Sequence, residues 1–220
     1  MAKILEIEDY CKFDLEREKR TGVPEIILAE GKDLEQLKSI VRELVERGEP
    51  VIVTRLERSV FDSIKGLGLD YFEKSRIAVF RKEKKKPNKK IALLSAGTAD
   101  FAVAGEARIV AEELGCEVIR FCDVGVAGLP RLLPAIEKIK SEGIKVVIVV
   151  AGMEGALPSV VAGLFDGLVI GVPTSTGYGY GGKGEAALKS MLQSCSPGVV
   201  TVNIDNGVGA AVAAALVAKK

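Results

Sequence analysis

The residues best suited to chemistry lie in glycine-rich turns that follow short apolar segments in the second half of the chain. The first such turn reads Ser95-Ala96-Gly97-Thr98-Ala99-Asp100. Hydroxyl groups and free backbone N–H groups meet the start of a predicted helix there, and this combination favours a phosphate. Thr98 and Asp100 are also residue types that cap a helix without any ligand. The turn therefore predicts phosphate binding, helix capping, or both.

The next two turns each carry one prominent carboxylate. Asp123 and Gly125 follow the second apolar segment, where an aspartate can hold a ribose hydroxyl or a metal ion, although loop aspartates usually serve turns. After the third segment, Gly152 and Gly155 surround Glu154. A lone carboxylate buried in such apolar sequence would have the setting of a general base. Helix capping is the alternative role for Glu154.

The fourth turn is a long loop that follows Pro173. It contains Thr174, Ser175, Tyr178 and Lys183 among several glycines and a second tyrosine. Aromatic faces and a cation suit a nucleotide, so we predict that this loop stacks on a heteroaromatic ring and closes over it. The loop is not a P-loop, because its lysine is followed by glycine instead of serine or threonine.

Cys195 and the final turn complete the set of polar positions. Cys195 lies at the end of a predicted helix. Most lone cysteines in helices are inert core residues, so its position in the sequence is compatible with either an inert core residue or a nucleophile. The last apolar segment leads into Asn203, Asp205 and Asn206, another polar turn. The alanine-rich helix that follows suits close packing within the domain or against another subunit.

Composition excludes several classes of function. The 220 residues include no histidine, which excludes a Ser-His-Asp hydrolase and a zinc site that needs imidazole. Lys and Arg number 31 against 30 Asp and Glu, and the resulting net charge of +1 gives no overall attraction to nucleic acid or an anionic membrane. We therefore expect neither of these as a partner.

The cysteines and the apolar stretches bear on location. The four cysteines form no CxxC pair, and charge appears almost at once at the start of the chain, unlike a signal peptide. We expect a reducing, cytoplasmic location. The most apolar stretch, Ile144 to Pro173, contains Glu154, Asp166 and several glycines. It is expected to form a buried core and no membrane span.

Strand and helix patterns alternate regularly in the second half of the chain. Predicted strands cover residues 91–94, 117–121, 146–150, 168–171 and 199–202, and predicted helices cover 100–114, 131–142, 155–164, 183–194 and 206–218. This alternation predicts a doubly wound parallel α/β sheet with helices on both faces. We predict a flavodoxin-like strand order 2-1-3-4-5, in which ligands bind at the carboxyl ends of the strands.

The first part of the chain predicts a smaller α/β domain over residues 1–88. Asp33 and Gln36 form a capping-box pattern for a helix that ends at Gly48. Strands are expected at 51–55 and 77–80, a short helix near 60–66, and loops and turns over 13–32. The basic run Arg81–Lys90 lacks aromatic residues, so we interpret it as a linker in preference to a nucleic-acid patch. The second domain then covers residues 89–220.

The ordered set of turns resembles one known family. The sequences SAGTAD, DVGVAGL, AGMEGALPSVVAGL, VIGVPTSTGYG and CSPGVVTVNIDNGVGAA, with RTGVPEIILAEGK upstream, are similar to the LarB family of pyridinium-3,5-biscarboxylic acid mononucleotide synthases. The similarity extends from near Phe13 to the C-terminus. The second half also resembles, more distantly, the carboxyaminoimidazole ribonucleotide mutase PurE and so implies a PurE-like fold.

The resemblance implies a specific reaction. LarB enzymes add a second carboxyl group from CO2 to the pyridinium ring of nicotinic acid adenine dinucleotide and cleave the phosphoanhydride to release AMP. The product is a precursor of the nickel-pincer nucleotide cofactor of lactate racemase and related enzymes. The family's nucleophilic cysteine corresponds to Cys195 and its active-site glutamate to Glu154. CO2 or bicarbonate is the expected co-substrate.

The predicted site therefore combines the two catalytic positions with the polar turns. The substrate-binding residues are expected to be Ser95, Gly97, Thr98, Asp100, Asp123, Gly125, Gly152, Thr174, Ser175, Tyr178, Lys183, Asn203, Asp205 and Asn206. Magnesium is expected from the phosphoanhydride chemistry, but no cluster of residues has the spacing of metal ligands. One departure concerns the family's usual His-Arg pair, because Pro130-Arg131 stands at that position here. Any role of that histidine is lost or falls to Arg131.

Two other functions are compatible with parts of the pattern. A PurE-type mutase explains the second domain but neither the first segment nor Cys195. A non-enzymatic nucleotide-binding module would explain the missing histidine. Relatives of this fold form octamers, so a homo-oligomer, with an octamer as one form, is the expected assembly.

Overall fold

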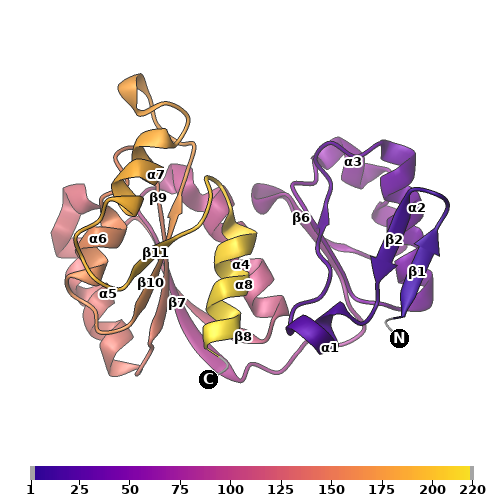
Figure 1. Cartoon of the computed structure of the whole chain (residues 1–220), viewed down its shortest axis with the longest axis horizontal. Coiled ribbons are helices and arrows are strands. Elements are labelled where there is room, and N and C mark those ends of the chain that lie inside the picture. The colour runs from indigo at the N-terminus through magenta and orange to yellow at the C-terminus, as the bar shows by residue number, and fades with distance from the viewer. Residues whose placement is uncertain (1–2, 219–220) are drawn as a thin grey trace. The chain divides into compact units, whose positions relative to one another are not determined.

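The computed structural model describes residues 3–218 and divides the chain into two compact units, Met1–Lys84 and Lys85–Lys220 (Figure 1). Each unit has its own sheet and its own buried apolar core. Across residues 3–218, no helix is both long enough and apolar enough to cross a lipid bilayer.

Five parallel strands form the sheet of the C-terminal unit. They are β7 (Lys89–Ser95), β8 (Cys116–Phe121), β9 (Val146–Ala151), β10 (Leu168–Pro173) and β11 (Val199–Thr201). Their order is β11-β10-β9-β7-β8, which from the other edge is 2-1-3-4-5 in chain order. The predicted α/β fold class and strand order are confirmed. All six residues of β9 are buried, as expected of a strand covered on both faces.

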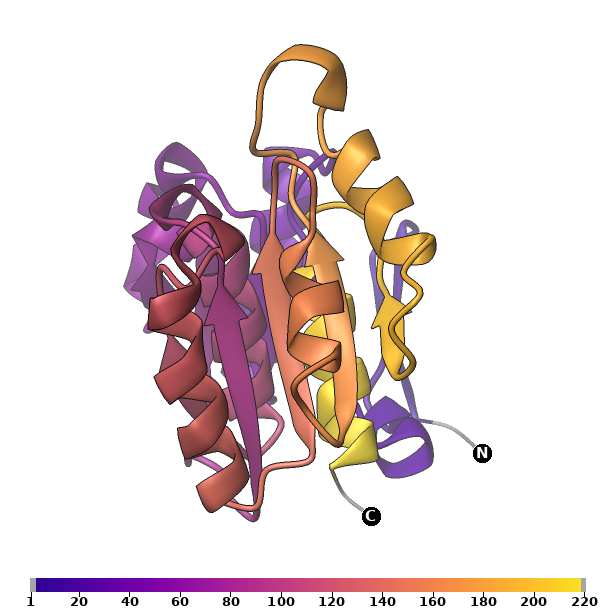
Figure 2. The same ribbon diagram turned by 90° about the vertical axis from the view of Figure 1, so that its left-hand side faces the viewer.

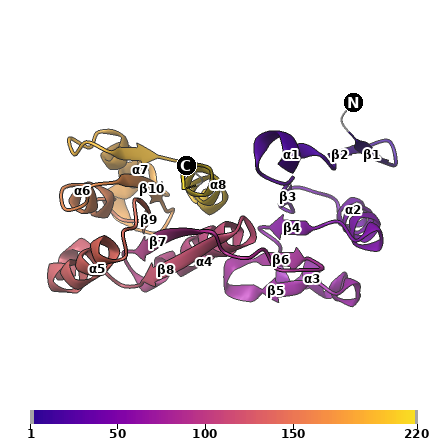
Figure 3. The ribbon, with the colours of Figure 1, turned by 90° about the horizontal axis from the view of Figure 1, so that it is seen from below.

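Helices cover both faces of this sheet. On one face lie α5 (Leu129–Ser141), α6 (Leu157–Ala162) and α7 (Glu185–Leu192), which stand in front of the strands in Figure 2. On the other face, α4 (Phe101–Glu113) packs against α8 (Gly207–Val217) (Figure 3). Gly207 permits this packing, because a Cβ there would lie 2.7 Å from the backbone oxygen of Val103. All five helices lie where the alternating sequence pattern predicted them, within a few residues at each end.

The N-terminal unit contains a hairpin and a four-stranded sheet. The hairpin pairs β1 (Ile4–Ile7) with β2 (Cys11–Asp14), and the sheet has the order β3-β4-β6-β5, formed by β3 (Ile27–Leu28), β4 (Val51–Thr54), β5 (Asp70–Phe72) and β6 (Ile77–Phe80). The helices are α1 (Arg17–Thr21), α2 (Leu34–Arg47) and α3 (Arg58–Asp62). Asp33 caps α2 as predicted, since its Oδ1 accepts from the N–H groups of Glu35 and Gln36.

The expectation of loops and turns over residues 13–32 was wrong in part. The end of β2, the short helix α1 and the strand β3 all fall in that range. No residue of α1 is buried, so it leaves no apolar periodicity in the sequence. Two local features accompany this turn of helix. Arg20 forms an ion pair with Asp14 at 2.5 Å, and Gly22 ends the helix in the left-handed conformation.

The end of the basic run belongs to the sheet. Lys89 and Lys90 open β7, and the Lys89 ammonium donates to the backbone oxygens of Leu114 and Ala215. Lys90 donates to Glu142 at 2.8 Å, which also pairs with Lys138. The hydrogen bonds and positive charges of Lys138 and Lys90 lower the pKa of the Glu142 carboxyl to about 2. Lys89 and Lys90 therefore anchor the start of β7, and the irregular part of the basic run ends before Lys89.

The core around β9 provides a test of the parallel sheet. Ile148 is fully buried at the centre of β9. Ile148→Ala is expected to lower the free energy of unfolding by about 2–5 kcal/mol, and Ile148→Val by about 0.5–1.5 kcal/mol, because the larger deletion leaves a larger cavity. Urea unfolding followed by circular dichroism measures both values. Equal losses for the two variants would contradict close packing at this position.

Candidate active site

The turns at the carboxyl edge of the sheet are joined to one another by backbone hydrogen bonds. After β7 and β8, the N–H of Val124 donates to the oxygen of Ser95 at 3.1 Å, and that of Gly125 donates to the oxygen of Ala96 at 2.9 Å. A Cβ on Gly125 would lie 2.8 Å from the Ala96 oxygen. Only glycine therefore allows these two turns to approach so closely.

The turns after β9 and β10 are joined in the same way. The N–H of Met153 donates to the oxygen of Thr176 at 2.9 Å, with Met153 in the left-handed region at φ +51°. Gly152 lies against this contact, and a Cβ on it would be 2.4 Å from the Thr176 oxygen. Sequence reasoning did not single out Met153 or Thr176. The neighbouring glycine was the only signal of this close approach.

Asp205 connects the turns after β10 and β11. Its Oδ1 accepts from the N–H of Ser175 at 2.8 Å, and its own N–H donates to the oxygen of Pro173 at 2.9 Å. Asn203 accepts from the N–H of Ile204, and Asn206 caps α8 by accepting from the N–H of Gly209 at 2.7 Å. These three predicted binding residues thus shape the final turn through their side chains.

Asp100 is the buried carboxylate of the edge. It is 4% exposed, and its oxygens accept from the N–H of Gly97 at 2.9 Å and the hydroxyl of Thr174 at 2.7 Å. The backbone N–H of Gly152 also donates to it. Burial raises the pKa of the Asp100 carboxyl, while these hydrogen bonds oppose the rise. The N–H of Gly97 is thus occupied by a side chain and is not free for an anion.

A cavity of about 380 Å³ opens between the turns that follow β7, β8 and β9. In a doubly wound sheet this is where the strand order reverses and where ligands bind. Seven of the predicted site residues line it, namely Gly97, Thr98, Asp100, Asp123, Gly125, Gly152 and Glu154. Ser95 lies outside this lining, 1% exposed, and its hydroxyl has no hydrogen-bond partner within residues 3–218.

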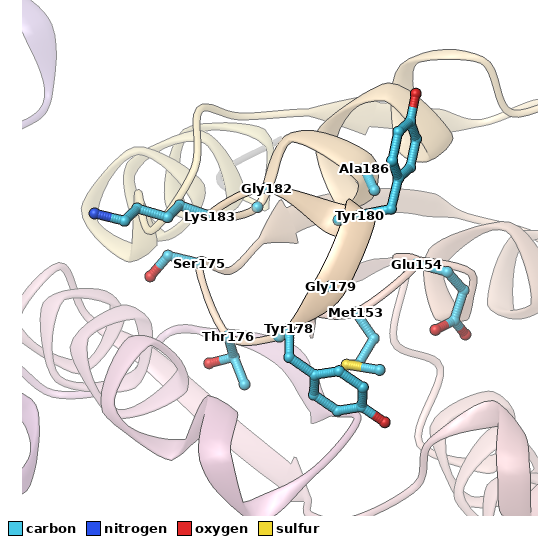
Figure 4. A pocket seen from close by; sticks show the side chains of 13 residues that line it. Met153, Glu154, Ser175, Thr176, Tyr178, Gly179, Tyr180, Gly182, Lys183 and Ala186 are labelled. Carbon is cyan, nitrogen blue, oxygen red and sulfur yellow. The ribbon is translucent and has the colours of Figure 1, made fainter.

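A second cavity of about 560 Å³ adjoins the first beneath the glycine-rich loop (Figure 4). Its lining includes the predicted residues Ser175, Tyr178 and Lys183. Met153, Glu154 and Thr176 line both cavities. Glu154 is exposed at this boundary, so the burial considered for it from the sequence does not occur within one chain.

Arg131 forms an ion pair with Asp123 at the rim of the first cavity. The guanidinium lies over Gly128, where a Cβ would be 2.5 Å from Nε. Pro130 occupies the first turn of α5, a position that proline fits without loss of a hydrogen bond. Arg131 thus brings a cation to the edge of the site, directly after Pro130.

Cys195 lies apart from both cavities within one chain. It is exposed in the connection between α7 and β11, which enters β11 at its amino end. The hydroxyl of Ser159 on α6 donates to Ser194 at 2.8 Å, and the hydroxyl of Ser196 donates to the backbone oxygen of Ser159 at 2.9 Å. These bonds hold the segment on both sides of the thiol against α6. Cys195 lines neither cavity, so the structure does not bring it to Glu154.

The carboxylates of the site do not form a metal centre. Within residues 3–218, no three Cys, Asp or Glu side chains lie together as metal ligands. Asp100, Asp123 and Asp205 instead bond to Thr174, Arg131 and Ser175, respectively. The residues present therefore do not fit a magnesium ion held by the protein alone.

Comparison with known proteins covers both units. The family model of the LarB/PurE-like N-terminal domain matches residues 5–83, and that of AIR carboxylase matches residues 90–219. An uncharacterized protein of Methanocaldococcus jannaschii, MJ0165, is 43% identical over 223 residues, covering 97% of this chain and 86% of the relative.

The buried Asp100 predicts a specific pH dependence. Its folded-state pKa is raised above the ordinary value of 3.8, so the unfolded chain loses this proton first as the pH rises. The free energy of unfolding of the wild type, relative to Asp100→Asn, should therefore fall as pH rises from 3.8 through the folded pKa, and then stay constant. Chemical denaturation at several pH values measures this difference. A difference that rises with pH would contradict the assignment.

Proposed function

The chain belongs to the LarB family and has a C-terminal domain of the AIR carboxylase type, and from this we propose that it carboxylates the pyridinium ring of nicotinic acid adenine dinucleotide. A carboxylase-type function follows from the two domains. The specific substrate is our proposal. It is supported above all by the two adjoining cavities that meet at Glu154, since a dinucleotide has two mononucleotide halves to accommodate.

The proposed chemistry begins with the Cys195 thiolate. A pyridinium carbon meta to nitrogen is electron-poor and does not attack CO2. Addition of the thiolate para to nitrogen forms a C–S bond and moves an electron pair into the ring, which becomes a neutral enamine. The meta carbon is then nucleophilic and forms a C–C bond to CO2. The thiolate suits this step because it is both a good nucleophile and an adequate leaving group.

Glu154 is proposed to restore the ring. It removes the proton from the newly carboxylated carbon, and expulsion of the thiolate then returns the ring to an aromatic pyridinium. Hydrolysis of the phosphoanhydride by water releases AMP and leaves the dicarboxylated mononucleotide. A chain without histidine must perform this proton transfer with a carboxylate, a lysine, a thiol or water, and Glu154 lines both cavities.

The reaction as proposed requires a second copy of the chain. Cys195 is exposed but lines neither cavity of its own chain, whereas Glu154 lines both. A thiol and a base that act on one ring must approach the same ligand. We therefore propose a homo-oligomer in which Cys195 of one copy meets the Glu154 side of another.

The activity is tested with the dinucleotide, bicarbonate and magnesium. The wild type should release AMP and a dicarboxylated mononucleotide, detected by mass spectrometry. Cys195→Ala should lower the rate by about 10³-fold or more and Glu154→Gln by about 10²–10⁴-fold. Cys122→Ala, which removes another exposed thiol, is the matched control and should remain active. Binding without turnover in the wild type would contradict the proposal and favour a nucleotide-binding module.

The shared site is tested by mixing two inactive variants. Cys195→Ala and Glu154→Gln are co-expressed with different tags, and oligomers that carry both tags are purified. If each site takes its thiol and its carboxylate from different copies, about one quarter of the sites in a random mixture regain both groups. Activity well above that of either variant alone is the expected result. Mixed oligomers as inactive as the single variants would show that one chain supplies both groups.

A further inference from the structure

We propose that the 560 Å³ cavity beneath the glycine-rich loop binds the adenylate half of the dinucleotide, with adenine packed against Tyr178 and Met153. This inference rests on the proposed function and assigns the two cavities to the two halves of its substrate. The 380 Å³ cavity at the strand ends then holds the pyridinium mononucleotide.

Tyr178 and Met153 form an apolar surface beside the boundary between the cavities. In Figure 4 the ring of Tyr178 and the thioether of Met153 lie on the same side of the loop, next to Glu154. Both side chains are open to solvent, with Tyr178 84% and Met153 44% exposed. An aromatic face and a polarizable sulfur are the groups that pack well against a purine. The large exposed apolar area is consistent with a surface that a ligand covers.

The backbone fixes this surface from below. The N–H of Met153 donates to the oxygen of Thr176 at 2.9 Å, which joins the turn after β9 to the start of the loop. Thr176 also lines both cavities. A ligand that extends across Met153 and Thr176 therefore passes from one cavity to the other, as the phosphates that link two nucleosides must do.

The lining and rigidity of the two cavities decide which half occupies which. Adenine is assigned to the larger cavity because the Tyr178 ring lines that cavity and not the smaller one. The smaller cavity is framed by turns that hydrogen-bond directly to one another, and a reacting ring needs such a fixed position. The loop over the larger cavity contains Gly177, Gly179 and Gly182 at positive φ and projects beyond the sheet edge in Figure 2. A cavity beneath this outlying loop suits AMP, because AMP is the product that the reaction releases.

Tyr180 provides a matched control within the same loop. Tyr180 also lines the larger cavity, but its ring points away from Tyr178 and Met153 in Figure 4, and the side chain is fully exposed. Substitution of either tyrosine removes the same group from the same segment. Only Tyr178 faces the surface assigned to adenine.

The test measures binding of each half separately to the full-length protein by isothermal titration calorimetry, with AMP and nicotinic acid mononucleotide as ligands. Tyr178→Ala should weaken AMP binding by about tenfold or more, since stacking on an aromatic side chain carries much of the binding of a base. Tyr178→Phe should bind AMP nearly as well as wild type, as should Tyr180→Ala. The affinity for nicotinic acid mononucleotide should be the same in all variants.

Three outcomes would overturn the assignment. AMP binding that does not depend on Tyr178 would remove adenine from this surface, and so would equal losses for Tyr178→Ala and Tyr180→Ala. A parallel loss of both mononucleotides in Tyr178→Ala would show that the loop does not separate the two halves. These results leave the carboxylation proposal standing if the wild type turns over the dinucleotide. Failure of the wild type to turn over the dinucleotide would overturn the carboxylation proposal, whatever the binding of the separate mononucleotides.

Discussion

The hydrogen bond from Thr174 to the buried carboxylate of Asp100 is the interaction on which the carboxyl edge of the sheet depends. A carboxylate removed from water is stable only when its oxygens are hydrogen-bonded. Asp100 receives its donors from three different turns, through the N–H groups of Gly97 and Gly152 and the hydroxyl of Thr174. The turns after β7, β9 and β10 must therefore keep their mutual positions. The cavity between the strand ends exists because this arrangement is fixed.

Around this centre, the polar residues of the edge divide into two groups. Asp205, Asn203 and Asn206 direct their side chains at backbone groups and so build the turns. Glu154 and Tyr178 stand exposed above those turns, at the boundary and in the loop. The first group makes a rigid edge, and the second remains available to a ligand. Such a division places reactive groups on a frame that does not move when they are changed.

The sequence was sufficient to predict the parallel sheet, but it predicted the arrangement of the site less completely. Apolar runs such as that of β9 and the helix periodicities between them determine a doubly wound topology, because few connections are possible. The location of Cys195 could not be predicted in this way, since it depends on how α7 and α6 pack. The burial of Asp100 and the roles of Met153 and Thr176 also arise from contacts between distant turns. In the N-terminal unit, α1 was not predicted, because it buries no side chain and so has no apolar periodicity in the sequence.

The glycine contacts at the edge restrict how this site can diversify. Gly125 and Gly152 each approach a backbone oxygen so closely that even the methyl group of alanine has no space. Neither glycine can be replaced by a residue with a side chain unless the two turns in contact move apart. Evolutionary change in ligand preference must therefore act on outward-facing positions such as Arg131 and Tyr178. The close backbone contacts thus make the frame the conservative part of the molecule and the rim its adaptable part.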